Sequence, residues 1–538
     1  MNASHYDIAS FEAATGFSGK TGQGLVAQQD LLLGYDFGTS AVKVALFARD
    51  GAIVAAATQG YRLILPERGW AEQDPQDWWA AMAAATRALV DAVPDAGGRI
   101  AAIGLSAQMG GVVPVDAEGS ALHNALIWLD TRSADIAREL TGGMIRVAGY
   151  GPLKLARWLR LTGGAPSLSG KDAISKIVWL QRHRPDLWPR VHKLLDVKDY
   201  LLAHLTGRFV TSFDSAHLTW LFDARPGRKR WSPTLLKQIG LPAARLPDIA
   251  GACDVAGGLS DGAAAELGLR PGTPVTVGTG DVAAAAISAG NPEEGSLHLY
   301  LGTSLWLAAR IARSRVDPGT SIGSLSFADG SDYLLIATQE NAGASIRWAM
   351  ALLGLAEDDF AGFEALARSH APTADGPFFF PWLTGERVPV DDPRIRGAFA
   401  NLGIESGRAA MAFAVYEGVA LNLRWAMASF DKLSGRIGQT LRLLGGGARS
   451  TFWAQMFADV LGRAVETVET PDQCGTLGAA MTAGVAAGWY PGLADAAAMT
   501  RPARVFAPDP ARAALYAARF GRYTGYYPRV KKWRPSQV

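Results

Sequence analysis

The stretch that decides the fold is Leu31-Leu32-Leu33-Gly34-Tyr35-Asp36-Phe37-Gly38-Thr39-Ser40. Its first five residues form the apolar run of a buried strand, which leads straight into a tight glycine turn. A second apolar run follows at residues 42–47, then the turn Arg49-Asp50-Gly51 and an extended run at residues 53–58. Strand, glycine turn, strand and hairpin turn predict an antiparallel start to a mixed sheet.

The rest of the first half alternates helical and extended patterns. We predict a helix at residues 76–92, a strand at residues 100–106 and several amphipathic helices within residues 155–205. Such alternation is typical of an α/β fold.

The second half repeats the opening pattern. Leu299-Tyr300-Leu301-Gly302-Thr303-Ser304 again runs a strand into a glycine turn, and an apolar strand follows at residues 305–311. Two such units in separate halves indicate two related lobes. We expect the boundary near residues 279–291, where a strand ends in Gly278-Thr279-Gly280-Asp281 and an alanine-rich helix begins.

Composition narrows the class of protein. The chain has 538 residues, 49% of them apolar and 19% charged, with a formal net charge of +2. This length favours two domains, and the near-neutral charge gives no reason to expect nucleic acid or a membrane as partner. No apolar run approaches the roughly 18 residues that span a bilayer. The two cysteines, Cys253 and Cys474, match no metal spacing, so we expect a reducing, cytoplasmic location.

The two ends of the chain differ from its body. Residues 1–30 are rich in Ser, Gly, Gln and Ala and lack the features of a signal peptide, so we expect a flexible extension. Residues 526–538 are expected to form a solvated, basic tail. Between the ends we predict an N-terminal lobe at residues 31–284 and a C-terminal lobe at residues 285–525.

The opening turn has the residues that phosphoryl transfer needs. That reaction requires donors that cradle phosphate oxygens, a carboxylate that organises Mg²⁺ and a base that orients the acceptor hydroxyl. Gly38 lets the backbone approach a phosphate, and Thr39 and Ser40 can donate to its oxygens. Asp36 could hold Mg²⁺ directly or through water. The structural alternative is an ordinary hairpin.

Two further glycine segments could bind nucleotide. Gly302-Thr303-Ser304 is the matching turn of the second lobe. Leu444-Gly445-Gly446-Gly447-Ala448-Arg449-Ser450 follows an apolar strand and precedes a helix beginning near Phe452. A strand–loop–helix unit places backbone N–H groups where a nucleotide can bind, although the spacing matches neither a Walker loop nor a dinucleotide fingerprint. Either segment could instead be a plain turn.

Asp281 is the candidate general base, because it stands where a buried strand passes into a helix. The structural alternative is a helix N-cap. A carboxylate suits the base role because the loose transition state deprotonates the acceptor late, so its position matters more than its basicity. The sequence contains no H-E-x-x-H, which disfavours zinc proteases.

In their order along the chain, these segments resemble the FGGY family of carbohydrate kinases, and its xylulokinases most of all. The resemblance extends from about Leu31 to Pro491. Its other motifs are GWAEQDP (69–75) with Trp78-Trp79, GLSAQM (104–109), WLDTR (128–132), KIVWL (176–180), KDY (198–200), LTG (205–207), GER (385–387), RGAF (396–399), EGVA (417–420), FWAQ (452–455) and GTLGAA (475–480).

The resemblance implies two actin-like (ribonuclease H-like) α/β lobes with ATP and sugar in the cleft between them. Homodimers are common among such relatives. Asp281 is the implied base and Asp36 the implied Mg²⁺ ligand. The implied ATP contacts are Gly38, Thr39, Ser40, Gly302, Thr303, Gly446, Gly447, Ala448 and Gln455, and the implied sugar contacts are Gln108, Met109, Trp128, Asp130 and Asp281.

The implied reaction is ATP-dependent phosphorylation of a pentulose, D-xylulose to D-xylulose 5-phosphate. Xylulokinases usually have His where Gly110 stands and Asn where Val282 stands, so two polar groups are missing from the expected sugar pocket. Another ketose or polyol, such as ribulose, erythritol or glycerol, therefore stays open as the acceptor. Asn401 also replaces a frequent Gly.

Two other classes of protein also stay open. One is a catalytically idle sugar- or nucleotide-binding regulatory protein, which the retained Asp36, Asp281 and glycine loops disfavour. The other is a heat-shock-type or filament ATPase of the same superfamily, which the sugar-kinase motifs disfavour.

Overall fold

The computed structural model describes residues 31–147, 149–290, 295–317, 319–435, 438 and 440–533. The extension predicted at residues 1–30 lies outside these ranges. The chain forms two compact units. The first contains residues up to Gly290 with Leu325–Asp332 and Gly475–Thr500, and the second contains Asn291–Ser324, Tyr333–Cys474 and Arg501–Val538.

The first unit is built on a mixed sheet with strand order β13-β14-β5-β1-β2-β3, and β15 also pairs with β5. As predicted, β1 is antiparallel to β2 and β2 to β3, whereas β1 and β14 run parallel to β5. The strands are β1 (Leu31–Phe37), β2 (Ala41–Phe47), β3 (Ile53–Gly60), β5 (Ile100–Ala107), β13 (Val255–Gly258), β14 (Pro274–Thr276) and β15 (Thr279–Gly280).

Short strand pairs and helices complete the first unit. The strand pairs are β4 (Glu72–Gln73) with β7 (Ala125–Leu126), β6 (Val113–Val115) with β8 (Lys193–Leu195), β9 (Val210–Ser212) with β12 (Asp248–Ala250), and β10 (Phe222–Asp223) with β11 (Arg230–Trp231). The helices are α2 (Pro75–Ala92), α3 (Ala96–Arg99), α4 (Ala134–Thr141), α5 (Pro152–Thr162), α6 (Ala173–His183), α7 (Val197–Thr206), α8 (Phe213–Leu218), α9 (Pro233–Ile239), α10 (Asp261–Leu267), α11 (Asp281–Ser288), α16 (Cys474–Ala486) and α17 (Leu493–Ala496).

The second unit has a sheet with strand order β18-β19-β17-β16-β22-β23-β24 and a separate pair, β20 with β21. Its strands are β16 (Leu297–Leu301), β17 (Leu305–Ile311), β18 (Gly323–Ser326), β19 (Tyr333–Gln339), β20 (Phe378–Phe380), β21 (Ala398–Ala400), β22 (Thr440–Leu444), β23 (Ala464–Val468) and β24 (Pro502–Phe506). Its helices are α12 (Gly343–Leu352), α13 (Phe360–Arg368), α14 (Arg408–Ser434), α15 (Thr451–Leu461) and α18 (Pro510–Val530).

The two sheets share one pattern. In each, three antiparallel strands (β3-β2-β1 and β19-β17-β16) are followed by two parallel strands (β5-β14 and β22-β23) and an antiparallel edge strand (β13 and β24). This repeat confirms the two related lobes that the strand–Gly-Thr-Ser–strand units predicted.

Strand β1 is buried on both faces, which explains its nearly unbroken apolar sequence. Leu33, Tyr35 and Phe37 face the core that contains Trp78 of α2, and α2 packs across β2 and β3. The Tyr35 hydroxyl is bonded at 2.7 Å to the hydroxyl of Thr86 in the same helix. Burial of the large apolar side chains on this face holds α2 against the sheet.

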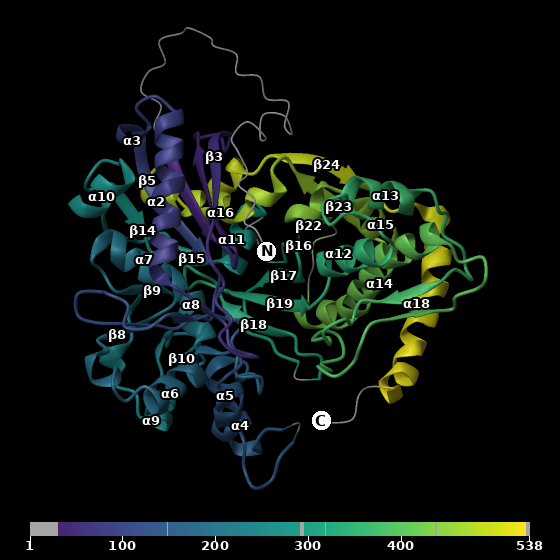
Figure 1. The fold of residues 1–538 in the computed structure, drawn as a ribbon, viewed down its shortest axis with the longest axis horizontal. Coiled ribbons are helices and arrows are strands. Elements are labelled where there is room, and N and C mark those ends of the chain that lie inside the picture. The colour runs from purple at the N-terminus through teal and green to yellow at the C-terminus, as the bar shows by residue number, and fades with distance from the viewer. Residues whose placement is uncertain are drawn as a thin grey trace. The chain divides into compact units, whose positions relative to one another are not determined.

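The opposite face of the first sheet is covered by α16, from the other end of the chain. A Cβ added at Gly34 of β1 would lie 2.1 Å from the carbonyl oxygen of Thr476. A Cβ added at Gly104 of β5 would lie 1.9 Å from the carbonyl oxygen of Ala479. The absence of side chains at these two positions therefore lets the helix backbone reach the sheet. Figure 1 shows this yellow-green helix beside the purple strands.

Two predicted domain boundaries fall inside helices. The boundary at residue 284 lies within α11, and the one at residue 526 lies within α18, which continues to Val530. Near the second boundary, Tyr526 packs against Phe380 at a ring distance of 5.6 Å. Among the helices of the described ranges, none combines the length and apolar character that crossing a bilayer requires.

Candidate active site

Three strands of the first unit end side by side. Ser106 of β5 pairs in register with Asp36 of β1 on one side and with Thr279 of β15 on the other. Because β5 is parallel to both strands, their carboxyl ends meet at one edge of the sheet, where α/β proteins commonly bind ligands. With neighbouring strands about 4.8 Å apart, Asp36 and the residues leading into Asp281 lie on either side of a single strand.

Asp36 is half-buried at the end of β1. One carboxylate oxygen accepts a hydrogen bond from the Ser106 hydroxyl at 2.9 Å. Burial raises the pKa of Asp36, although the Lys43 charge and the Ser106 hydrogen bond oppose this rise. The other oxygen faces the first turn of α16, where a Cβ added at Gly475 would lie 2.1 Å from it. Glycine at position 475 therefore leaves the carboxylate its space.

The turn that follows Asp36 is held by its own backbone and by Tyr61. The Gly38 N–H donates to the Ala41 carbonyl at 3.0 Å, and the Tyr61 N–H donates to the Ser40 carbonyl at 3.1 Å. The Tyr61 hydroxyl donates to the carbonyls of Gly38 and Ala41. Ser40 is exposed and Thr39 half-buried, so both hydroxyls lie at the surface of a fixed turn.

Asp281 is the first residue of α11 and not its N-cap, which is Gly280. One carboxylate oxygen of Asp281 accepts the N–H of Val282 at 2.9 Å. Burial, followed by the negative charge of Asp36, raises the pKa of Asp281 to about 7, with smaller contributions from Asp196 and Asp214. A carboxylate that titrates near neutral pH is suited to proton transfer at physiological pH.

Gln108 and Met109 follow β5 and lie beside these residues. The side-chain amide N–H of Gln108 donates to the side-chain carbonyl oxygen of Gln73 at 2.7 Å. The side-chain amide N–H of Gln73 donates to the backbone carbonyl of Thr39 at 2.7 Å. A Cβ added at Gly280 would lie 2.1 Å from the Met109 sulfur, so Met109 packs directly on the residue before Asp281.

Trp128 connects the residues expected to contact the sugar with the turn at Gly38-Thr39-Ser40, which is expected to bind phosphate. Its indole N–H donates to the Thr39 hydroxyl at 3.0 Å. The ammonium group of Lys171 lies 5.7 Å from the centre of the Trp128 ring. The structure thus brings Asp36, Thr39, Gln108, Met109, Trp128 and Asp281 into one contiguous group within the first unit.

Asp130 has a different environment from the other predicted sugar contacts. It is fully buried and forms an ion pair with Arg132 at 2.7 Å. Its two oxygens also accept the backbone N–H groups of Ala71 and Arg132. Arg132 lies 3.7 Å from the Trp70 ring centre and pairs with Glu72 at 2.7 Å. In this structure Asp130 therefore fixes the segment that carries Trp128.

In the second unit, the start of α12 braces the turn Gly302-Thr303-Ser304. The Gly343 N–H donates to the Gly302 carbonyl at 3.0 Å, and the Ala344 N–H donates to the Thr303 carbonyl at 3.0 Å. The exposed Arg347 guanidinium donates to the Thr303 hydroxyl at 2.8 Å. A positive charge beside an exposed hydroxyl turn is a favourable environment for phosphate oxygens.

The glycine segment after β22 forms a short 3₁₀ turn, Gly446–Arg449, before α15. Gly445 has φ +83°, a left-handed value that glycine adopts without strain. A Cβ added at Gly446 would meet no atom within 4 Å, whereas one added at Gly447 would lie 2.5 Å from the Leu301 side chain. Gly446 therefore borders open space, and Gly447 is packed.

Gln455 lies on α15, and its side chain is already engaged. Its amide donates to the Asp459 carboxylate and to the Ala507 carbonyl, both at 2.8 Å. Contact between Gln455 and a nucleotide would require its amide to share or exchange these partners.

Two sequence matches decide the family. Residues 31–288 match the N-terminal domain of the FGGY family of carbohydrate kinases, and residues 298–487 match its C-terminal domain. The chain belongs to the FGGY family. Like other members, it is an ATP-dependent sugar kinase whose substrate is a small sugar molecule.

Relatives of known sequence and structure agree with this assignment. The chain is 32% identical over 492 residues to the xylulose kinase of Escherichia coli, which covers 91% of this chain and 97% of that enzyme. A xyloylose kinase structure from Brucella ovis matches with a TM-score of 0.84 and 31% identity, covering 94% of this chain and 100% of that one. A gluconate kinase from Lactobacillus acidophilus has the same TM-score of 0.84 at 26% identity, covering 93% and 98%.

The structure accounts for two of the three departures from the FGGY pattern, Asn401 and Gly110. Asn401 has φ +60°, and asparagine tolerates this left-handed region better than most residues. Its side-chain amide also donates to the Asp375 carbonyl at 2.6 Å. Gly110 has φ +79°, a left-handed value that glycine adopts without strain, and a Cβ added there would lie 3.7 Å from the Leu218 side chain. Val282 is half-buried in the first turn of α11. The backbone conformation therefore favours glycine at position 110, whereas nothing in the structure explains Val282.

The half-buried Asp196 and the buried Lys176, which the sequence analysis did not assign to the site, hold the loop at Gly110. The Asp196 carboxylate accepts the N–H groups of Gly110 and Gly111 at 3.0 and 2.8 Å. The Lys176 ammonium donates to the carbonyls of Gly110 and Ile127 at 2.8 and 2.7 Å. Burial lowers the pKa of Lys176 to about 8. The sequence signal for Lys176 was a lysine inside the apolar run of the KIVWL motif.

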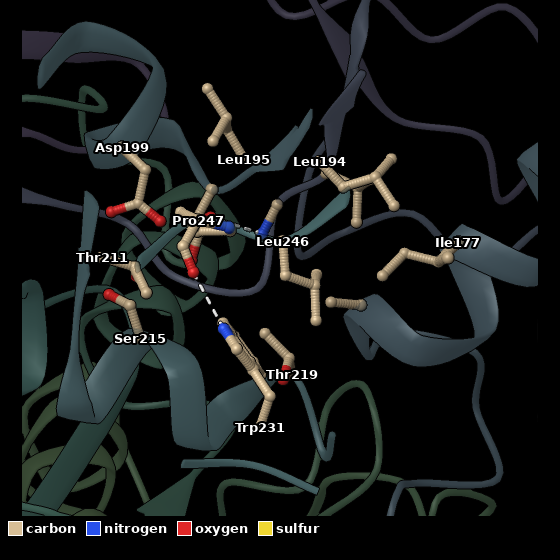
Figure 2. Close-up of a pocket in the computed structure, with 14 residues that line it drawn as sticks. Ile177, Leu194, Leu195, Asp199, Thr211, Ser215, Thr219, Trp231, Leu246 and Pro247 are labelled. Atoms are coloured by element: carbon tan, nitrogen blue, oxygen red, sulfur yellow. Dashed lines mark hydrogen bonds between the residues drawn. The ribbon is translucent and has the colours of Figure 1, made fainter. Parts of the chain in front are cut away.

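Behind this loop the first unit contains a small pocket with a volume of about 20 Å³ (Figure 2). Polar side chains of Asp196, Asp199, Thr211 and Ser215 line it together with apolar residues. Trp231 closes one side, where its indole donates to the Pro247 carbonyl at 2.8 Å. The pocket has room for about one water molecule and is too small for a sugar.

Proposed function

We propose that this FGGY kinase phosphorylates a pentulose, with D-xylulose as the first candidate. The proposal is carried by the placement of Asp36 and Asp281 on either side of β5, in a chain 32% identical to a xylulose kinase. In the proposed reaction the acceptor oxygen bonds to the γ-phosphorus of ATP, the bond from that phosphorus to the β,γ-bridging oxygen breaks, and the hydroxyl proton passes to Asp281. A pKa of about 7 leaves a substantial fraction of Asp281 ionised and able to accept this proton at neutral pH.

Gln108 is the proposed acceptor of a hydrogen bond from the sugar. Its side-chain carbonyl oxygen is buried without a hydrogen-bond partner among the described residues. An unpaired buried acceptor costs about 1–3 kcal/mol, which a sugar hydroxyl would recover on binding. Met109 and Trp128 supply apolar surface for the carbon face of the sugar. Because Asp130 is fully buried in its ion pair, we propose that it acts by positioning Trp128.

Phosphate binding is proposed for the two Gly-Thr-Ser turns. Thr39 and Ser40 belong to the first unit, and Thr303, beside Arg347, belongs to the second. The open backbone at Gly446, followed by Gly447 and Ala448, is the proposed support for the nucleoside, with Gln455 at its edge.

Mg²⁺ fits Asp36. Within the described residues, no group of three or more His, Cys, Asp or Glu side chains is placed to hold a metal ion. Mg²⁺ commonly keeps several waters and takes only one or two carboxylates besides substrate phosphates, so a single carboxylate is sufficient. Asp36, oriented by Ser106 and given space by Gly475, is that carboxylate. When bound, Mg²⁺ neutralises charge on the transferred phosphate.

A different ketose or polyol is the second candidate acceptor. Gly110 and Val282 remove two polar side chains, and sites that lose such partners discriminate differently among hydroxyl patterns. The gluconate kinase likeness shows that the same fold, at the same TM-score of 0.84, occurs in a kinase named for another sugar.

The test is ATP-dependent ADP release over D-xylulose, L-xylulose, D-ribulose, erythritol, glycerol and gluconate, with Asp281→Ala alongside. Turnover selective for D-xylulose and abolished in the variant is the expected result. Selectivity for another compound would keep the kinase and replace the acceptor. ATP binding without turnover on any of these compounds would contradict the proposal and favour a regulatory binding protein.

We also expect this reaction to occur in the cytoplasm. Among the described residues Cys253 and Cys474 form no disulfide bond, which is compatible with a reducing compartment. The homodimer implied by the resemblance is tested by light scattering on the purified full-length chain.

A further inference from the structure

Asp214 lies directly behind the residues that present Asp281. It is in the first turn of α8 and is 1% exposed. One carboxylate oxygen accepts the Gly280 N–H at 2.8 Å, and the other accepts the Ser212 hydroxyl. Gly280 is the N-cap of α11, and the residue after it is Asp281. A side chain 66 positions away in sequence therefore fixes the backbone immediately before the proposed base.

The hydrogen-bond partner of the Gly280 N–H comes from outside α11, because it is the Asp214 carboxylate of α8. The other neighbours of Gly280 also restrict it. The Met109 side chain packs against its Cα, and the Thr279 hydroxyl donates to its carbonyl at 2.6 Å. With the N–H held by Asp214, the peptide groups on both sides of Gly280 have fixed orientations. The direction in which Asp281 leaves the helix start is set by these contacts.

The buried Lys198 acts on Asp214 through its charge. Lys198, 2% exposed, donates to Asp199 at 2.6 Å and to the Val277 carbonyl at 3.0 Å, four residues before Asp281. Burial raises the pKa of Asp214, and the Ser212 hydrogen bond and the Lys198 charge oppose this rise. A buried carboxylate is costly unless it is paired or hydrogen-bonded, and Asp214 accepts hydrogen bonds from Ser212 and Gly280.

We propose that Asp214 is a positioning residue for the kinase reaction, which orients Asp281 through the Gly280 N–H and adds a fixed negative charge behind it. The inference rests on the proposed role of Asp281 as base. The charged groups that face Asp281 are Asp36 of β1, Asp196 ahead of α7 and Asp214 of α8, and all three act in the same direction on its ionisation.

Two variants distinguish the hydrogen bond that Asp214 accepts from its negative charge. Asp214→Ala removes the acceptor for the Gly280 N–H, so Asp281 is misaligned and kcat falls by about tenfold to a hundredfold with little change in the sugar KM. Asp214→Asn can still accept that N–H but lacks the charge. It is expected to retain most of kcat and to move the rising limb of the kcat/KM profile toward lower pH, because a repulsion that disfavours ionised Asp281 is gone.

The control is Asp223→Asn. Asp223, in β10, is also a buried carboxylate of the first unit and is 4% exposed. It pairs with Arg225 and not with Gly280. This variant is expected to keep the wild-type kcat and the wild-type pH limb. A limb shift of the same size in Asp223→Asn would overturn the proposal, since the effect would then be one of general destabilisation.

The deciding experiment is single-turnover phosphoryl transfer in wild type, Asp281→Asn, Asp214→Ala and the double variant. If Asp214 acts through Asp281, the Asp214→Ala loss disappears in the Asp281→Asn background. An equal loss in both backgrounds overturns the inference alone, whereas full activity of Asp281→Asn overturns both the base assignment and this inference. If Asp214→Ala does not fold, the kcat/KM–pH profile of Asp214→Asn decides. A shift of its rising limb to lower pH supports the proposal, and an unmoved limb overturns it.

Discussion

The Trp128 indole donates a hydrogen bond to the Thr39 hydroxyl at 3.0 Å, and so joins the expected sugar side of the first unit to its phosphate turn. The same turn is held a second time, through the Gln73 amide at the Thr39 carbonyl. Hydrogen bonds therefore link the residues expected to bind sugar to the turn expected to bind phosphate. A change on the sugar side is expected to alter the handling of phosphate as well.

Trp128→Phe tests this connection. Phenylalanine keeps the aromatic face and loses the N–H donor, so the Thr39 hydroxyl is released. One hydrogen bond of about 1 kcal/mol corresponds to a change of roughly fivefold, which we expect in kcat/KM for both ATP and sugar. Steady-state kinetics with each substrate varied in turn measures it. Trp79→Phe is the control, because its indole bonds Glu266 at an exposed site; an effect confined to the sugar KM would contradict the connection.

The raised pKa of Asp281 predicts the pH dependence of the reaction. The base must be ionised to accept the hydroxyl proton, and burial with the Asp36 charge raises its pKa to about 7. We therefore expect kcat/KM for the sugar to rise with pH through about 7 and then level off. A profile that is flat from about pH 5.5 to 8.5 would contradict this assignment, because an unshifted carboxyl titrates near about 4.

The same pKa predicts a stability change in Asp281→Asn. Because the folded protein holds this proton more tightly than the unfolded chain, whose carboxyl titrates near about 3.9, stability falls as pH rises from about 4 to about 7. Asparagine can keep the Val282 N–H contact and cannot ionise. We expect the Tm of the variant to exceed that of wild type at about pH 8 and the gap to shrink toward about pH 5. Thermal melts across this range measure it, and a gap that does not change with pH would count against the shift.

Gly475→Ala tests the space beside Asp36. The new Cβ would lie 2.1 Å from an Asp36 oxygen, so the carboxylate or the start of α16 must move. We expect at least a tenfold loss of kcat, on the scale that small misplacements of reacting groups produce, and a lower Tm. Gly262→Ala in α10 is the control, because its Cβ meets no atom within 4 Å, and it is expected to be neutral or slightly stabilising. Wild-type activity in Gly475→Ala would show that the reaction does not need the space beside the Asp36 carboxylate.

Gly446→Ala and Gly447→Ala form a matched pair in the second unit. A Cβ at Gly446 meets no protein atom within 4 Å, whereas one at Gly447 lies 2.5 Å from Leu301. If Gly446 supports the nucleoside, Gly446→Ala should weaken ATP binding by calorimetry and leave Tm unchanged, while Gly447→Ala lowers Tm. Unchanged ATP affinity in Gly446→Ala would remove this position from the nucleotide site.

Local patterns predicted the framework of both units. The apolar run at Leu31, the turn after Asp36 and their echo at residues 299–311 gave the two related sheets, because strand periodicity and turn preference depend on neighbouring residues. The same patterns put Asp281 at a strand-to-helix junction. These predictions are confirmed, because β1 and β16 form as strands and α11 begins at Asp281, directly after β15.

Tertiary structure decided which residues support the site. The Gly280 N–H could not be paired with Asp214 from sequence, nor Gly475 with Asp36, because these partners are 66 and 439 positions apart along the chain. The sequence likewise gave no sign that Asp130 is fully buried in an ion pair. The sequence by itself determined the family, the two sheets and the two carboxylates, Asp36 and Asp281, beside the strand ends of the first sheet, since these follow from local residue patterns. The orientation and pKa of Asp281 were decided by the fold alone, because burial and charge at that carboxylate come from β1, α7 and α8, whose positions only the folded chain defines.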